Sequence, residues 1–315
     1  MVRPGLVTGV VGRILLGAGV LILLFVAYQL WGTGIAESHS QTVLRQRFDS
    51  LLHAEHARVP PTSTSTSGPS TTTTTSPGSD QPTVGPTIAA PNEGSPVGFL
   101  TIPRIGMSNK VIVEGTGTDD LRQGPGHYTG TPLPGEAGNA AIAGHRTTYG
   151  APFYNLDELK PGDPIDVTTL QGSFTYLVTT SVVVSPSDSA VVSDTTANEL
   201  TLTTCNPRFS ASTRLVVHAV LSKNDRPAPA LAQAPAKEKG GKTQARGLAG
   251  NEGDWVPALE LGAVSAVVIT AMFVVARRRR RRMRRSIVYA VGGAASLVAL
   301  FFFFGAVSPL LPASF

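Results

Sequence analysis

Three long apolar stretches constrain this chain more than any other feature. Residues 14–31 carry no charge and are about long enough to cross the hydrocarbon core of a bilayer, and residues 256–276 and 287–311 are apolar over similar lengths. Arg3 and Arg13 precede the first stretch, and no small-residue cleavage site follows it, which indicates an uncleaved signal anchor. The sequence therefore predicts a multi-pass membrane protein with three transmembrane helices.

Eight arginines between the second and third apolar stretches predict the topology. They lie within residues 277–285 and belong on the cytoplasmic side by the positive-inside rule. The N-terminus is then cytoplasmic as well, and the chain from about Gly34 to Asp254 is extracellular. Without these arginines the formal net charge of +5 becomes −3, so the basic composition reflects topology and contact with the membrane. We expect no nucleic-acid partner, because no aromatic side chains accompany the cluster.

Composition divides the chain into membrane segments, linkers and one domain. Thr, Ser and Pro dominate one linker, and Pro, Ala, Lys and Gly dominate the other, so neither has enough apolar residues to form a core. We expect residues 1–33 to form the cytoplasmic N-terminus and the signal anchor, and residues 34–97 to form a juxtamembrane segment, helical in its first part, and a disordered linker. The domain is expected at residues 98–222 and a flexible linker at residues 223–254. The last two spans are expected at residues 255–276 and 286–311, with the cytoplasmic arginine cluster at residues 277–285 between them.

Residues 98–222 predict an all-β domain. Short runs of apolar and β-branched residues alternate with glycine and proline turns, a pattern typical of strands. The expected strands are residues 98–102, 110–113, 140–143, 164–169, 172–184, 199–204 and 213–221, and one short helix is expected at residues 155–159. A closed or nearly closed barrel accommodates so many short strands without open edges.

Cys205, the only cysteine, follows the end of one of these strands. Extracellular cysteines are usually paired in disulfides, so a single one indicates either a reactive thiol or a small buried apolar side chain. If Leu200 and Leu202 point into the core, Cys205 lies on the opposite face of the strand together with Thr201 and Thr203. Its thiol is then a candidate nucleophile near the mouth of the barrel.

Arg214 is the candidate cation beside this thiol. Antiparallel pairing of residues 199–204 with residues 213–221 brings Arg214 close to Cys205, where a guanidinium can stabilise a thiolate or a developing oxyanion. A surface ion pair is the alternative role for Arg214, and Arg208 is the rival cation.

His145 is the candidate acid and base. It follows a strand on a glycine-bounded loop, a favourable position for a catalytic side chain, whereas His127 has a similar setting and is favoured less. His218 lies four residues beyond Arg214, about 13 Å further along an extended strand, which indicates a structural role.

Two segments of the chain resemble the sortase family of membrane-anchored transpeptidases. They are Gly144-His145-Arg146-Thr147-Thr148-Tyr149-Gly150 and Thr201-Leu202-Thr203-Thr204-Cys205, followed by Arg214. The resemblance covers residues 98–221, and the residues around Cys205 are most similar to the class E subfamily of actinobacteria. It implies an eight-stranded sortase-type β-barrel with short helices, in which His145, Cys205 and Arg214 form the catalytic triad.

The resemblance also implies a reaction and its partners. In that family the cysteine cleaves a C-terminal sorting motif of a secreted surface protein between Thr and Gly and transfers the acyl group to an amine of a peptidoglycan precursor. Class E enzymes are associated with Leu-Ala-x-Thr-Gly in place of Leu-Pro-x-Thr-Gly. Thr204 is then a candidate oxyanion contact, and Tyr128 is a candidate contact for the motif or, alternatively, a packing aromatic.

Several alternatives remain open at this point. We expect no cofactor and no metal, because one cysteine and scattered histidines do not form a ligand cluster, although Glu114, Asp119 and Asp120 leave a calcium site possible. A cysteine hydrolase would use the same triad with water as the second nucleophile. A catalytically silent module that binds peptides is the alternative outside enzymes. The two C-terminal spans indicate contacts with a partner or control of orientation, since one signal anchor is enough to tether the domain.

Overall fold

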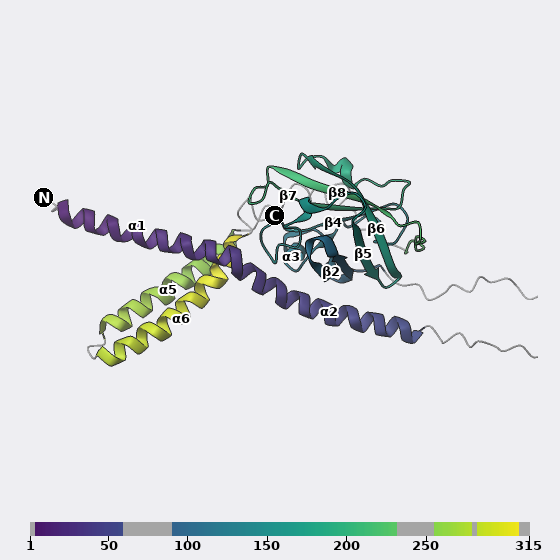
Figure 1. Cartoon of the computed structure of the whole chain (residues 1–315). Helices are drawn as coiled ribbons and strands as arrows, with labels where there is room; N and C mark the ends of the chain where they lie inside the picture. The colour runs from purple at the N-terminus through teal and green to yellow at the C-terminus, as the bar shows by residue number, and fades with distance from the viewer. Residues whose placement is uncertain (1–3, 59–89, 232–254, 279–281, 309–315) are drawn as a thin grey trace, which may run out of the picture.

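The computed structural model describes residues 4–58, 90–231, 255–278 and 282–308. Most of the two predicted linkers lies outside the described residues, as does the centre of the arginine cluster, so these predictions stay predictions. Figure 1 shows a β-barrel beside a long N-terminal helix, with a helical hairpin from the C-terminal part of the chain extending away from the barrel.

The N-terminal apolar stretch continues without interruption into the juxtamembrane segment. Helix α1 (Pro4–Ala27), a π-helical turn η1 (Tyr28–Gly32) and helix α2 (Thr33–Arg58) follow one another directly. α1 points away from the barrel, and α2 lies along it (Figure 1). The helix predicted in the juxtamembrane segment is therefore confirmed, and it is continuous with the span.

The C-terminal apolar stretches form an antiparallel hairpin of α5 (Val256–Arg278) and α6 (Arg282–Val307) (Figure 1). Among the described residues, this hairpin and the N-terminal helix supply three helices long and apolar enough to cross a membrane. The predicted helices are thus confirmed, whereas their orientation in a membrane belongs to the proposals below.

Eight strands close into a barrel in the order β1-β2-β3-β4-β7-β8-β6-β5, so the predicted all-β fold is confirmed. The pairs β2–β3 and β4–β7 are parallel, and the other neighbouring pairs are antiparallel. The bounds are β1 Pro96–Ile102, β2 Met107–Glu114, β3 Gly126–His127, β4 Asn139–Ala143, β5 Pro164–Thr169, β6 Gly172–Val184, β7 Glu199–Asn206 and β8 Thr213–Leu221.

All seven strands expected from the sequence are present, and three of them have the predicted bounds. β3 was not expected, because two residues are too few to show an alternating pattern. The helix expected at residues 155–159 is the 3-10 turn η3 (Leu156–Glu158). Three other short helical elements were not expected: η2 (Pro103–Ile105), α3 (Thr118–Leu121) and η4 (Ser189–Val192).

Alternating side chains of the strands fill the barrel. Leu200 and Leu202 of β7 are fully buried in this core, as their spacing predicts. Leu100, Ile112, Ile142, Ile165 and Val217 join them from other strands.

Helix α2 packs on the outside of β1 and β2. Leu44 and Phe48 are buried there, and the Phe48 ring meets the Phe99 ring edge-on with centroids 4.9 Å apart. Burial of side chains of this size stabilises the docked helix by roughly 1.5–3 kcal/mol each. α2 is therefore fixed to the barrel, and α1 is connected to the barrel domain through it.

Gln41 of α2 also compensates for the shortness of β3. Because β3 pairs only with the end of β2, the middle of β2 has no strand partner on that side. The Gln41 amide donates to the carbonyls of Val111 (3.0 Å) and Gln123 (2.8 Å), and its carbonyl accepts from Val111 N–H at 2.8 Å. One buried side chain thus satisfies backbone groups that would otherwise lack partners.

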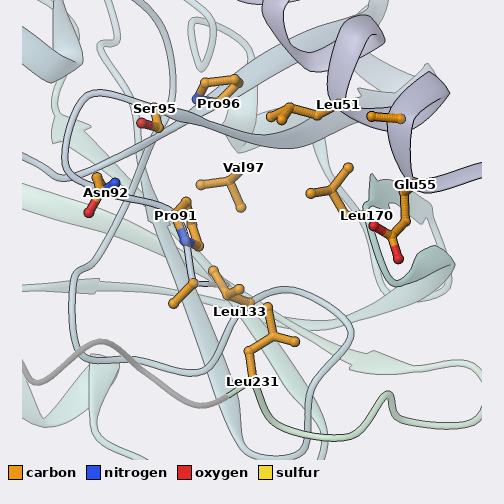
Figure 2. Close-up of a pocket in the computed structure, with 12 residues that line it drawn as sticks. Leu51, Glu55, Pro91, Asn92, Ser95, Pro96, Val97, Leu133, Leu170 and Leu231 are labelled. Atoms are coloured by element: carbon orange, nitrogen blue, oxygen red, sulfur yellow. The ribbon is translucent and has the colours of Figure 1, made fainter. Parts of the chain in front are cut away.

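A cavity of about 320 Å³ lies between the last turns of α2 and the barrel (Figure 2). Its walls are mainly apolar and include Leu51, Val97, Leu133 and Leu231. Leu170 of the β5–β6 turn also lines it, whereas Cys205 does not.

Candidate active site

Cys205 and Arg214 are direct neighbours across the β7–β8 pair. The register joins Cys205 to Arg214 and Thr201 to His218, so the predicted antiparallel pairing is confirmed. The Arg214 Nη1 atom donates to the carbonyls of Ala211 (2.9 Å) and Thr213 (3.1 Å), which fixes the guanidinium beside the end of β7.

His145 reaches the same place from β4. β4 pairs in parallel with β7, so both strands end at one edge of the barrel, and the chain turns at Gly144 immediately before the histidine. Gly144 N–H donates to Thr203 O at 3.0 Å, and the Thr204 hydroxyl donates to Gly144 O at 2.7 Å. A side chain at Gly144 would collide with Phe153, since a Cβ there would lie 2.5 Å from its ring. This glycine therefore allows the turn that brings His145 to Cys205.

The three predicted triad residues line one small cavity. His145, Cys205 and Arg214 surround it together with Leu121 of α3, and a volume of about 20 Å³ leaves room for about one water molecule. Only 3% of the surface of Cys205 and of His145 is exposed. The sequence predicted a thiol near an edge, and the structure places it at that edge in a closed site.

The outer face of β7 is covered as well as the inner face. Thr201, Thr203 and Cys205 share this face and are all buried. Leu121, Tyr128 and Val192 form a second apolar cluster with β4. This layer comes from α3, from the β3–β4 connection and from η4 in the β6–β7 connection, and no local sequence pattern predicts it.

Burial keeps both reacting groups neutral in the closed site. It raises the pKa of the Cys205 thiol, against the smaller opposing effects of Arg214 and Arg146. Burial, assisted by the charge of Arg122, lowers the pKa of His145 to about 3. The closed site at neutral pH therefore contains a thiol and an uncharged imidazole.

Arg146 is a further residue of the site that sequence reasoning did not single out. Its guanidinium is buried and donates to Cys205 O at 3.2 Å and to Asn206 Oδ1 at 2.9 Å, and it pairs with Asp157 at 3.0 Å. Arg208 reaches the same Asp157 carboxylate at 2.8 Å and lies over the Tyr154 ring. Arg146 thus fixes the end of β7. Its position next to His145, in a motif with charged residues, was the sequence feature from which this role could have been predicted.

The less favoured histidines have structural partners. The buried His127 ring contacts the Glu114 carboxylate at 2.8 Å and Pro132 O at 2.9 Å. His218 contacts the Thr201 hydroxyl at 3.0 Å, four register positions from Arg214.

Tyr128 and Thr204 have internal contacts in the structure. Tyr128 is fully buried and its hydroxyl forms a hydrogen bond of 2.8 Å with Thr203, which favours the packing alternative for this aromatic. The Thr204 hydroxyl is occupied by Gly144 O, so a role as an oxyanion contact requires that bond to change.

The acidic residues near β2 are distributed over different contacts. Glu114 pairs with His127, Asp120 accepts from Gly117 N–H at 3.1 Å, and Asp119 pairs with Arg122. Within the residues that the structure describes, no group of three or more His, Cys, Asp or Glu side chains is arranged to hold a metal ion.

Comparison with known proteins identifies relatives of the barrel domain. The family model described as "Sortase domain" matches residues 100–222. Sortase SrtE1 of Streptomyces coelicolor is 30% identical over 229 residues, which cover 66% of this chain and 55% of that protein. The putative sortase YwpE of Bacillus subtilis is 34% identical over 85 residues, and this alignment covers 83% of that protein.

The chain belongs to the sortase family. The similarity to SrtE1 also confirms the resemblance to class E sortases that the motifs indicate. Among solved structures, sortase E from Streptomyces avermitilis is 39% identical, with a TM-score of 0.39 over 42% of this chain and 90% of that one. This sortase spans 55% of the length of SrtE1.

Proposed function

We propose that this sortase is a membrane-anchored cysteine transpeptidase. Its barrel would cleave the Thr–Gly bond of a C-terminal sorting motif and transfer the threonyl acyl group to an amine of a cell-wall precursor. The observation that carries the proposal is that Cys205 and Arg214, from the neighbouring strands β7 and β8, meet His145, from the loop after β4, around one cavity.

Each residue has a defined role in the proposed reaction. The Cys205 sulfur, as thiolate, attacks the threonine carbonyl carbon, and Arg214 stabilises the oxyanion that forms. The C–N bond to glycine breaks as His145 gives a proton to the leaving amine, and a thioester remains on Cys205. The acceptor amine then attacks the thioester, His145 takes the proton of that amine, and the new amide forms as the thiolate leaves.

The neutral, closed site requires one further step. The thiolate and the imidazolium are the reactive forms, and both are disfavoured while burial raises the pKa of Cys205 and lowers that of His145. We infer that substrate binding displaces the cover over the cavity and brings polar groups to the site. Proton transfer from Cys205 to His145 then becomes less costly.

The proposed orientation in the membrane follows from the spans and the arginines. α1, α5 and α6 would cross the membrane, with the N-terminus and the arginine cluster inside and residues 98–222 outside as the catalytic domain. Secreted proteins with a sorting signal would then be the substrates. α2 lies along the barrel with its first residue beside the active-site loop, so the active-site end of the barrel would face the membrane.

The test uses the full-length protein in detergent with a Leu-Ala-x-Thr-Gly peptide and hydroxylamine as the amine. Mass spectrometry should detect a threonine hydroxamate that is absent with Cys205→Ala. A Leu-Pro-x-Thr-Gly peptide in parallel tests the motif preference. Cleavage that yields only free threonine acid would assign a cysteine hydrolase, and an adduct that persists in Cys205→Ala would refute the assignment of the nucleophile.

A further inference from the structure

The loop after His145 adopts a backbone conformation that needs support. Three successive residues have left-handed backbone angles: Tyr149 (φ +49°), Gly150 (φ +73°) and Ala151 (φ +43°). Residues other than glycine in this region cost about 1 kcal/mol or more each, and they persist only where the surroundings hold them.

The support comes from helices outside the barrel. Tyr149 N–H donates to the hydroxyl of Thr33, the first residue of α2, at 3.1 Å. At Gly150 a Cβ would lie 2.6 Å from Glu37 Oε2, so α2 packs directly on the loop backbone.

Ser308, the residue that follows α6, contacts the same loop. The Tyr149 hydroxyl donates to Ser308 Oγ at 3.2 Å, and the Ser308 hydroxyl donates to Gln29 Oε1 of η1 at 3.2 Å. Ser308 is fully buried, and Tyr149 is 5% exposed. Two segments 279 residues apart in the sequence, η1 and the end of the C-terminal hairpin, are thus joined at the Ser308 hydroxyl, which also accepts from Tyr149.

Tyr149 connects this junction to His145. The two rings lie with centroids 4.9 Å apart at an angle of 34°. The Arg122 guanidinium lies over the Tyr149 ring, 5.9 Å from its centroid. It also donates to Gly305 O of α6 at 3.4 Å. The C-terminal hairpin thus contacts the barrel domain through Tyr149 and Arg122. The Tyr149 ring lies against His145, and the charge of Arg122 acts on His145.

We propose that the outer end of α6 is a positioning element of the active site, in which Ser308 acts through Tyr149 to hold the loop that carries His145. This gives the C-terminal hairpin a role beyond anchoring, since α1 alone suffices to tether the barrel. Tyr149, Ser308 and Gln29 are positioning residues, because they act through the loop and not on the substrate. The inference rests on the proposed function in assuming that His145 takes part in the reaction.

The test measures kcat and KM of the full-length protein in detergent with the peptide and hydroxylamine. Ser308→Ala and Tyr149→Phe each remove the hydroxyl bond, and each should lower kcat about 3- to 10-fold with KM nearly unchanged. The double variant should be no worse than Ser308→Ala alone, because Ser308→Ala already removes the bond to Tyr149 together with the bond to Gln29. Ser308→Thr retains a hydroxyl and should remain close to wild type.

Ser296→Ala is the matched control. It makes the same change in α6, where the Ser296 hydroxyl bonds only within the hairpin, to Gly292 O and the Met272 sulfur. A kcat of Ser308→Ala and Tyr149→Phe equal to that of Ser296→Ala would overturn the proposal. Thermal unfolding of each variant separates loss of the fold from loss of positioning.

A second measurement does not depend on turnover. Cys205 is the only thiol, so iodoacetamide labelling reports its accessibility directly. Ser308→Ala and Tyr149→Phe should accelerate labelling about threefold or more as the loop loosens, and Ser296→Ala should not. If the wild-type protein does not convert the peptide, the proposed function fails. The labelling rates alone then decide whether α6 positions the loop.

Discussion

At the scale of single residues, Arg214 and Arg208 make different contributions, although Arg208 is the nearer of the two to Cys205 in the sequence. Arg214 is 4% exposed and its Nη1 is fixed by two backbone carbonyls, whereas Arg208 forms a partly exposed pair with Asp157. The first is a buried guanidinium at the reacting thiol, and the second is a loop contact.

Arg214→Ala should therefore lower kcat about 100-fold or more, because it removes the proposed oxyanion donor. Arg214→Lys should not restore the rate, because an ammonium cannot reproduce the donors of the fixed guanidinium. Arg208→Ala is the control and should change kcat by less than about twofold, as expected for an exposed pair. Steady-state kinetics with the peptide and hydroxylamine measure all three, and equal losses for Arg214→Ala and Arg208→Ala would contradict the assignment.

The burial of Cys205 predicts how its reactivity depends on pH. The thiolate is the species that reacts with iodoacetamide, and its pKa is raised in the folded protein. Labelling of the substrate-free protein should thus rise only at higher pH than labelling of the protein unfolded in urea, whose thiol has an ordinary pKa of about 8.5. A plateau of the native labelling rate below pH 7 would instead indicate a preformed thiolate–imidazolium pair.

At the scale of elements, the docking of α2 decides how the barrel is held relative to the span. The sequence of α2 has charged residues between scattered apolar ones, and its length and continuity with α1 do not follow from that pattern. Leu44 and Phe48 face the barrel, and Gln41 bonds β2 where β3 is too short to do so.

Phe48→Ala should destabilise the folded protein by about 3 kcal/mol, because it removes a fully buried ring and its contact with Phe99. Leu51→Ala, one turn later on α2, changes a side chain that is 43% exposed and should cost less than about 1 kcal/mol. Denaturant unfolding of the full chain in detergent compares the two. Similar losses of stability would mean that α2 is not held through Phe48.

At the scale of the whole molecule, the spans and the barrel meet at the active-site loop. The start of α2, the end of α6 and Ser308, which follows α6, contact Arg122 and Tyr149 of the barrel domain. The proposed topology puts this junction at the outer membrane surface, where a sorting motif and a lipid-bound acceptor would both be within reach.

The topology is tested with single cysteines in a Cys205→Ala background. Asn224→Cys lies after the barrel and should react with a membrane-impermeant maleimide in intact cells. Ser286→Cys lies beside the arginine cluster and should react only after the membrane is permeabilised. Labelling of Ser286→Cys in intact cells would reverse the proposed orientation of the hairpin.

The sequence by itself predicted the spans, seven of the eight strands and the pairing of Cys205 with Arg214. These features depend on local periodicity and on the register of neighbouring strands, which one segment of chain can encode. The motifs around His145 and Cys205 also predicted the catalytic triad and the family.

Only the tertiary structure decided what surrounds the triad. The closed cover from Leu121, the support of β7 by Arg146, and the bond from Tyr149 to Ser308 join residues that no local pattern connects. β3 and the Gln41 contact escaped prediction for a related reason, since two residues carry no periodicity and a single amide in a helix has no required partner. Side-chain contacts between distant segments depend on how whole elements pack, and that packing is a property of the folded molecule.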